Sequence, residues 1–99
     1  MISACGETKE EKTYKLMKSA KRNLALSRSA EALEDVKKVL EIDPEHWEAC
    51  YYMGNCYANL KKLDKALESY NRAIALKPDY AKAFANRGNI WSYKGRQDK

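Results

Sequence analysis

The apolar positions of this chain follow a helical spacing between residues 9 and 93. Alanine, leucine, valine and aromatic residues recur three or four positions apart, with charged residues between them. This period places the apolar side chains on one face of a helix that packs against a core. The pattern is interrupted at residues 27–29, 43–44, 60–63 and 77–79. It therefore predicts five helices, over about 9–26, 30–42, 46–59, 64–76 and 80–93.

The predicted helices repeat at a fixed interval of 34 residues. The clearest pairs at this distance are Pro44 and Pro78, Ala32 and Ala66, and Gly54 and Gly88. Larger side chains keep the same interval in two series, Leu16, Cys50 and Phe84, and Asn23, Tyr57 and Trp91. Because the residue before a proline is driven away from helical angles, each proline marks the end of a helical hairpin. The chain is therefore built from copies of one helix-turn-helix unit.

The middle copy reads Cys50-x2-Met53-Gly54-x2-Tyr57, then Ala66-x3-Tyr70, then Pro78. It resembles the tetratricopeptide repeat, written W-x2-L-G-x2-Y, A-x3-F, P, with only the opening tryptophan replaced outright. The third copy reads Phe84-x2-Arg87-Gly88-x2-Trp91, and the first reads Leu16-x2-Ser19-Ala20-x2-Asn23. Asn23 departs from the aromatic pattern, so the first copy is the weakest.

The resemblance implies an all-α fold, with antiparallel helix-turn-helix repeats stacked as a short right-handed α-solenoid. Two full hairpins and one further helix are expected. Residues 1–8 are expected to form a flexible N-terminus, and residues 9–99 a single tetratricopeptide domain. Within it, the first repeat covers about 13–46, the second about 47–80, and a partial third about 81–99.

Small residues are predicted to face large ones where the helices of a hairpin meet. Gly54 and Ala66 allow close approach, while Tyr57 and Tyr70 fill the space around them. Gly88 is given the same role of helix contact. Cys50 is expected to be a small buried packing residue.

Three polar or flexible residues are assigned to helix ends. Ser29 and Asp64 are predicted N-caps, because a short oxygen-bearing side chain can accept a hydrogen bond from the first turn. Gly95 is predicted to break the last helix, since glycine adopts the left-handed conformation of a C-terminal residue without strain.

Composition indicates a globular protein without a membrane span. The chain has 99 residues, of which 44% are hydrophobic and 33% charged, a balance typical of globular domains. Its start carries neither a basic prelude nor a long apolar segment, so no secretory signal is expected. Three cysteines form no disulfide framework, which favours a reducing, cytoplasmic location. A net charge of +5 favours acidic partners but is too small for a nucleic-acid signature.

Enzyme chemistry, metals and cofactors are not expected. His46 is the single histidine and falls in a junction, where a loop or helix-start role outweighs that of a catalytic base. No nucleophile has a base beside it, no glycine-rich phosphate loop is present, and the spacing of cysteine and histidine fits no zinc site.

A protein-interaction role is expected because the first helix of each hairpin lines the concave side in the family that the chain resembles. Asparagine amides both donate and accept hydrogen bonds, which suits the backbone of an extended peptide, and tyrosine adds apolar area. The predicted peptide-binding residues are Tyr51, Tyr52, Asn55, Asn59, Lys82, Asn86 and Asn89. The carboxylate clamp of some family members is not expected, because Tyr51 stands where that clamp has lysine.

The last helix presents a second hypothesis, in which the chain acts as a self-association or assembly element. Phe84, Ile90 and Trp91 would normally be covered by helices that do not follow in this sequence, and repeat arrays usually finish with a polar capping helix. Two explanations stay open: the chain is part of a longer array, or this end pairs with another copy.

Overall fold

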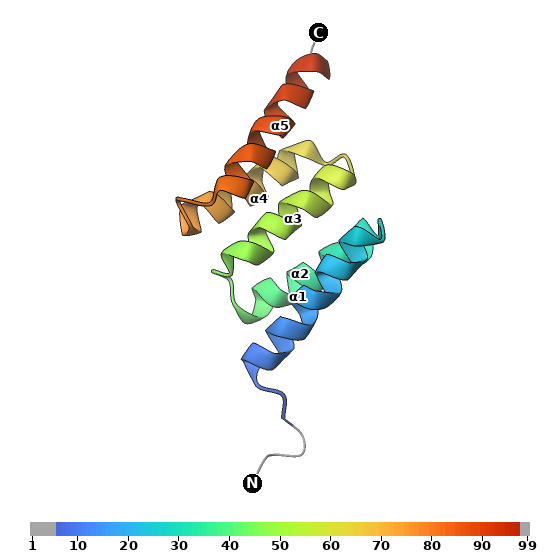
Figure 1. Cartoon of the computed structure of the whole chain (residues 1–99), viewed down its shortest axis with the longest axis vertical. Helices are drawn as coiled ribbons and strands as arrows, with labels where there is room; N and C mark the ends of the chain where they lie inside the picture. Colours follow the sequence, from blue (N-terminus) through green and yellow to red (C-terminus); the bar gives the residue numbers. More distant parts are fainter. Residues whose placement is uncertain (1–5, 98–99) are drawn as a thin grey trace.

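The computed structural model describes residues 6–97, and in this part of the chain it contains helices and connecting turns but no strand. The helices are α1 (Lys9–Ala25), α2 (Ser29–Ile42), α3 (Trp47–Asn59), α4 (Leu63–Leu76) and α5 (Ala81–Gln97). They stack along one direction into a body measuring 62 × 28 × 17 Å, with α1 and α5 toward its opposite ends (Figure 1). The predicted all-α helical-repeat solenoid is confirmed.

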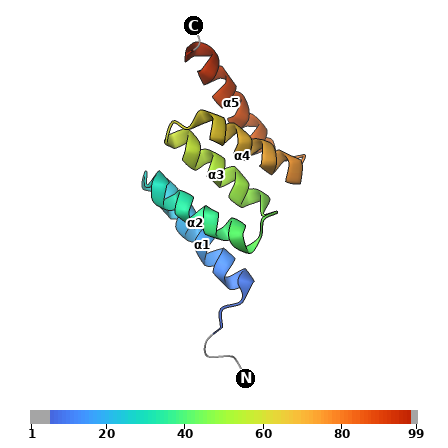
Figure 2. The same cartoon turned by 180° about the vertical axis from the view of Figure 1, so that it is seen from behind.

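The helices form two layers. The first helices of the hairpins, α1, α3 and α5, lie in one layer, and α2 and α4 lie in the other, which faces the viewer in Figure 2. Each helix contacts the next along the chain, and α1 also contacts α3. This arrangement places α1, α3 and α5 side by side on one surface of the molecule.

The densest packing joins α3 to α4, as the small-to-large pattern predicts. Gly54 is buried, and a β-carbon added to it would lie 2.5 Å from the ring of Tyr70. Tyr70 is itself 1% exposed, and Cys50 and Ala66 beside it are fully buried. The tyrosine ring thus occupies the space that a larger residue at position 54 would need.

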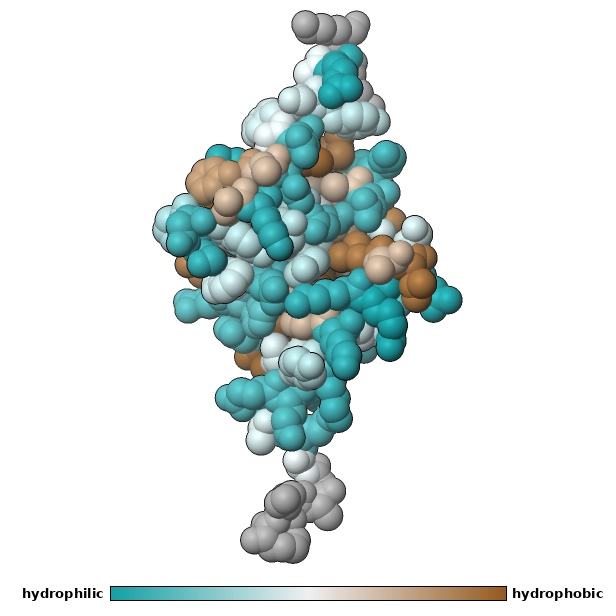
Figure 3. Space-filling model, in the orientation of Figure 1, coloured by the Kyte–Doolittle hydropathy of each residue, from teal (hydrophilic) through white to brown (hydrophobic). Residues whose placement is uncertain are grey.

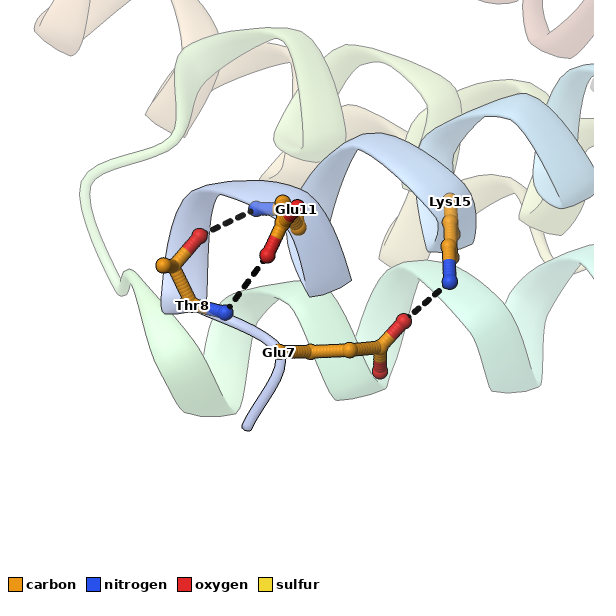
Figure 4. Close-up of polar contacts among 4 residues, drawn as sticks. All are labelled: Glu7, Thr8, Glu11 and Lys15. Atoms are coloured by element: carbon orange, nitrogen blue, oxygen red, sulfur yellow. Dashed lines mark hydrogen bonds and ion pairs between the residues drawn. The ribbon is translucent and has the colours of Figure 1, made fainter. Parts of the chain in front are cut away.

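The start of α1 is fixed by a capping box (Figure 4). The Thr8 hydroxyl accepts a hydrogen bond from the Glu11 backbone N–H at 3.1 Å, and the Glu11 carboxylate accepts one from the Thr8 N–H at 2.9 Å. An ion pair between Lys15 and Glu7 lies beside the box. Two orphan backbone donors are therefore satisfied by side chains. Of the segment predicted to be flexible, residues 1–5 lie outside the described residues.

The two predicted N-caps are wrong, because tertiary partners hold these side chains. Ser29 is the first residue of α2 rather than its cap, and its hydroxyl accepts a hydrogen bond from Asn59 at 3.1 Å. Asp64 lies in the first turn of α4, where its carboxylate binds Lys94 at 2.8 Å. The caps are the backbones of Arg28 and Lys62, neither of which makes a side-chain cap bond.

The predicted helix break at Gly95 is also wrong. α5 continues to Gln97, and Gly95 does not adopt a positive φ. Lys94 and Arg96 lie in the last turn, where cationic side chains interact favourably with the negative end of the helix dipole. The last helix is therefore longer than the sequence pattern predicts.

The two hairpin turns share one backbone conformation. Ser27 has φ 61° and Lys61 has φ 64°, and these residues are 34 positions apart. The left-handed conformation is unfavourable for residues with a β-carbon. Its recurrence shows that the repeat fixes the geometry of the turn as well as that of the helices.

Candidate functional site

A groove of about 540 Å³ runs along the layer of α1, α3 and α5. Its lining combines amide, aromatic and small apolar side chains: Leu24, Ala25, Tyr52, Asn55, Ala58, Asn59, Tyr70, Asn86, Asn89 and Ile90. All of these except Tyr70, which reaches through from α4, belong to the first helices of the three copies. We call this surface the amide groove.

Two asparagines join α3 and α5 at the floor of the amide groove. Asn86 Nδ2 donates a hydrogen bond to Asn55 Oδ1 at 2.9 Å and another to the Tyr51 hydroxyl at 3.2 Å. Asn55 Oδ1 also accepts a hydrogen bond from the Tyr70 hydroxyl at 2.5 Å. Each amide therefore uses one of its two polar ends to hold the repeats together, and Asn55 Nδ2 and Asn86 Oδ1 make no hydrogen bond within residues 6–97.

The other predicted groove residues have different surroundings. Asn59 is tied to the first repeat through its bond to Ser29. Asn89 is exposed, and its side chain makes no hydrogen bond with residues 6–97. Tyr52 is half-buried, and Lys21 Nζ lies 5.6 Å from the centre of its ring. Burial raises the pKa of the Tyr52 hydroxyl.

Two residues predicted for peptide binding lie outside the lining of the amide groove. Tyr51 is 9% exposed and contacts the rings of Tyr52, Tyr70 and Tyr80 at centroid distances of 5.1, 6.0 and 5.0 Å. Tyr51 is thus a core residue whose hydroxyl supports Asn86. Lys82 is exposed and does not line the groove.

A second hollow of about 660 Å³ lies between the first half of α1 and the connection from α2 to α3. Its lining includes Tyr14, Met17, Lys18 and Lys21. Lys21 pairs with Glu48 at 3.5 Å, so part of the positive charge of this region is neutralised within the chain.

Some lining residues were missed by the sequence reasoning. Ala58 follows Asn55 by three residues, so the helical spacing that grouped the asparagines also places it on the groove face. Tyr70 was assigned to packing alone, because no local pattern shows that its hydroxyl reaches Asn55 on another helix.

The aromatic residues predicted for self-association are divided by the structure. Phe84 and Trp91 are 42% and 58% exposed, whereas Ile90 is 8% exposed and belongs to the core with Tyr51 and Tyr70. The face of the molecule drawn in Figure 3 is mainly hydrophilic, with separate apolar patches.

The buried titratable groups are kept neutral by their surroundings. Burial raises the pKa of the Cys56 thiol to about 11 and that of the Tyr70 hydroxyl to about 12. Burial also raises the pKa of the Cys50 thiol, although Arg72 acts in the opposite direction. A thiol held in the protonated form is a poor nucleophile. His46 Nδ1 accepts a hydrogen bond from the Ala49 N–H at 3.1 Å, so the histidine caps α3. Within residues 6–97 no cluster of acidic, histidine or cysteine side chains is arranged to hold a metal.

Stacked helical hairpins with a groove along one layer define an all-α helical-repeat protein. Residues 47–80 match the tetratricopeptide repeat family, and proteins named for such repeats are among the relatives. The chain belongs to the tetratricopeptide repeat family. In general terms, a fold of this family is a protein-interaction module.

Similarity to individual proteins extends over most of this chain. It is 38% identical over 69 residues to the protein O-mannosyl-transferase TMTC1 of Homo sapiens, covering 66% of this chain and 8% of that protein. It is 30% identical over 84 residues to the BBSome complex member BBS4 of Bos taurus, covering 84% of this chain and 16% of that protein. The crystal structure of MamA superimposes with a TM-score of 0.80 at 28% identity, covering 87% of this chain and 50% of that one.

The chain therefore spans less than a fifth of the length of these two sequence relatives. The shared region is the helical repeat. One relative is named a transferase, but the match extends over 8% of its length. No helix within residues 6–97 has the length and apolar character required to cross a bilayer.

Proposed function

We propose that this chain is a non-enzymatic protein-interaction module that binds an extended segment of a partner protein in the amide groove. The observation that carries the proposal is the pairing of Asn55 with Asn86 across two repeats.

The hydrogen-bond pattern of this pair is complementary to a peptide unit. Asn86 Nδ2 and Asn55 Oδ1 are used in the contact between the helices. This leaves the side-chain donor Asn55 Nδ2 and the side-chain acceptor Asn86 Oδ1 for a ligand. A peptide unit presents one carbonyl acceptor and one N–H donor. The two asparagines can therefore bind one peptide unit at both of its polar groups, whatever the side chains of the partner.

The rest of the lining supplies apolar area for the side chains of an extended segment. Leu24, Ala25 and Ala58 form the apolar part, and the ring of Tyr52 stands beside them. The hydrogen bond from Asn86 to Asn55 joins α5 to α3 before the ligand arrives. Preorganisation of this kind lowers the entropic cost of binding.

The experiment selects a displayed library of unstructured peptides on the parent chain and, separately, on the Asn89→Trp variant. The ring added in this variant is expected to occupy the groove and exclude the ligand. Peptides enriched only by the parent chain are then measured by fluorescence anisotropy. Asn89 lines the groove one turn after Asn86, and we expect its exposed amide to donate or accept one further hydrogen bond with the ligand. Asn89→Ala should therefore weaken these peptides about threefold to tenfold. Its melting temperature is expected to stay the same, because Asn89 is exposed.

Lys82→Ala is the matched control, since Lys82 is exposed on the same helix and does not line the groove. Its peptide affinity should equal that of the parent. Equal enrichment by the parent and Asn89→Trp, or equal losses in Asn89→Ala and Lys82→Ala, would refute the groove as the binding site.

A further inference from the structure

A second surface lies on α5 outside the amide groove. Phe84, Gly88, Trp91 and Gly95 are spaced by four, three and four residues, so they follow one line along the helix. All four are exposed. We call this line the α5 stripe.

The α5 stripe repeats the face of α3 that α4 covers. Phe84, Gly88 and Trp91 stand 34 residues after Cys50, Gly54 and Tyr57. A β-carbon at Gly54 would meet Tyr70, whereas one at Gly88 or Gly95 would meet nothing within 4 Å. The predicted helix contact at Gly88 is therefore not made within residues 6–97. The helix that would supply it, the counterpart of α4, is not among them.

The stripe is complementary to a second copy of itself. Gly88 and Trp91 lie at equal distances on either side of the midpoint between residues 89 and 90, and so do Phe84 and Gly95. We propose that α5 of a second copy packs antiparallel on the stripe about a two-fold axis at this midpoint. Each aromatic ring then faces a glycine of the other copy, Trp91 facing Gly88 and Phe84 facing Gly95.

This pairing continues the packing already present inside the chain. At the contact of α3 with α4, a tyrosine ring lies directly over Gly54 and fills the space left by the missing side chain. The same rule, applied across a two-fold axis, gives an isologous interface in which one patch serves both partners. The two aromatic residues of the stripe are seven positions apart, and so are its two glycines. Seven residues is the interval at which paired helices stay in contact.

The two-fold register keeps the cationic side chains of the two α5 helices from facing one another. α5 carries four cationic and no acidic residues, but Arg87 donates to Asn71 and Lys94 binds Asp64, both at 2.8 Å. These two cations are held by the same chain's α4. In the two-fold register, Arg87 stands opposite Ser92 and Lys94 opposite Ala85, so neither stands opposite a like charge.

The geometry leaves the stripe accessible. The C-terminal part of α5 projects beyond the end of α4 (Figures 1 and 2). A single pair of helices of this length is small beside the interfaces of permanent dimers, so we expect a dissociation constant in the micromolar range. The excess of positive charge on both helices should make the dimer tighter as salt is added.

Sedimentation equilibrium from about 1 to 200 µM tests the proposal on the chain of residues 1–99. The parent should move from monomer to dimer. Gly88→Trp should remain monomeric, because two large rings then face each other, and Trp91→Gly should weaken the dimer at least tenfold. The double variant carrying both changes should regain the dimer, because a ring again faces a glycine at each contact.

Exchanging residues 88 and 91 is informative because Gly88 faces open space and Trp91 is 58% exposed in the monomer. Circular dichroism should therefore show every variant folded. Lys82→Trp, on a different face of α5, is the control for general adhesion and should behave as the parent. The proposal is overturned if the parent stays monomeric, if the folded double variant stays monomeric, or if Lys82→Trp alone increases association.

Discussion

Gly54 and Gly88 hold the same position in two helices 34 residues apart, yet their surroundings are opposite. Gly54 is buried under a tyrosine ring, and Gly88 faces open space. The difference arises because α3 is followed by a packed second helix within the described chain and α5 is not. A small residue in a repeat therefore marks a place where a helix can dock, and its energetic role depends on whether that helix is present.

The comparison predicts its largest effect at Gly54. In Gly54→Ala the new methyl group would overlap the Tyr70 ring, which is 1% exposed. We expect a loss of about 2 kcal/mol in the free energy of unfolding, because overpacking exceeds the gain in helix propensity. Urea denaturation followed by circular dichroism measures it. An unchanged midpoint would mean that Tyr70 can move without cost.

The ring over Gly54 should also make stability depend on pH. The ordinary pKa of tyrosine is 10, and burial raises that of Tyr70 to about 12. Because the folded protein holds this proton more tightly than the unfolded chain, the contribution is complete below pH 10. It declines as the pH rises from 10 to 12. We expect a fall of up to about 2 kcal/mol over this range.

Tyr70→Phe isolates this contribution. The variant should lose about 1 kcal/mol at neutral pH, since the hydrogen bond to Asn55 disappears. Above pH 10 its stability should decline less steeply than that of the parent. Parallel pH profiles for the two proteins would assign the alkaline loss to other groups.

At Gly88 the same substitution should act in the opposite direction. Gly88→Ala adds a methyl group to open space in the interior of α5, where alanine is favoured over glycine by about 1 kcal/mol. Thermal unfolding at a protein concentration low enough to keep the chain monomeric should show a higher melting temperature. A lower one would contradict the open surroundings of Gly88.

The smallest effect is expected at the hairpin turns, where the two repeats agree. Ser27→Gly relieves a left-handed conformation at φ 61°, which costs about 1 kcal/mol for a residue with a β-carbon. The greater freedom of glycine in the unfolded chain offsets part of this gain. A net stabilisation of about 0.5 kcal/mol should appear in urea denaturation. Ser27→Ala, which keeps the β-carbon, is the control and should show no gain.

Local sequence patterns were least successful at the helix ends. Ser29 and Asp64 have side chains typical of N-caps, but their partners are Asn59 and Lys94, which are 30 residues away in the sequence. Gly95 has the residue type of a C-terminal break, yet α5 continues through it. A capping preference is worth about 1 kcal/mol, so a tertiary hydrogen bond or ion pair of similar strength is enough to redirect the side chain.

The groove was predictable in its location and less so in its detail. Asn55, Asn86 and Asn89 share a helix face that the 34-residue period reveals, and all three line the amide groove. Tyr51 has the same local environment in the sequence as Tyr52, but it is buried among aromatic rings. The two neighbours point in directions 100° apart on the helix, and the rings of Tyr70 on α4 and of Tyr80 before α5 decide which one is covered.

The sequence by itself determined the repeat, the order of the helices and the position at which Gly54 meets Tyr70, because these follow from a periodic pattern of side-chain sizes. The tertiary structure decided which ends of the Asn55 and Asn86 amides are used and which of two equivalent glycines is covered. Those outcomes depend on contacts between helices separated by a whole repeat. Local propensities do not encode such contacts, because each becomes possible only when the neighbouring helix has packed.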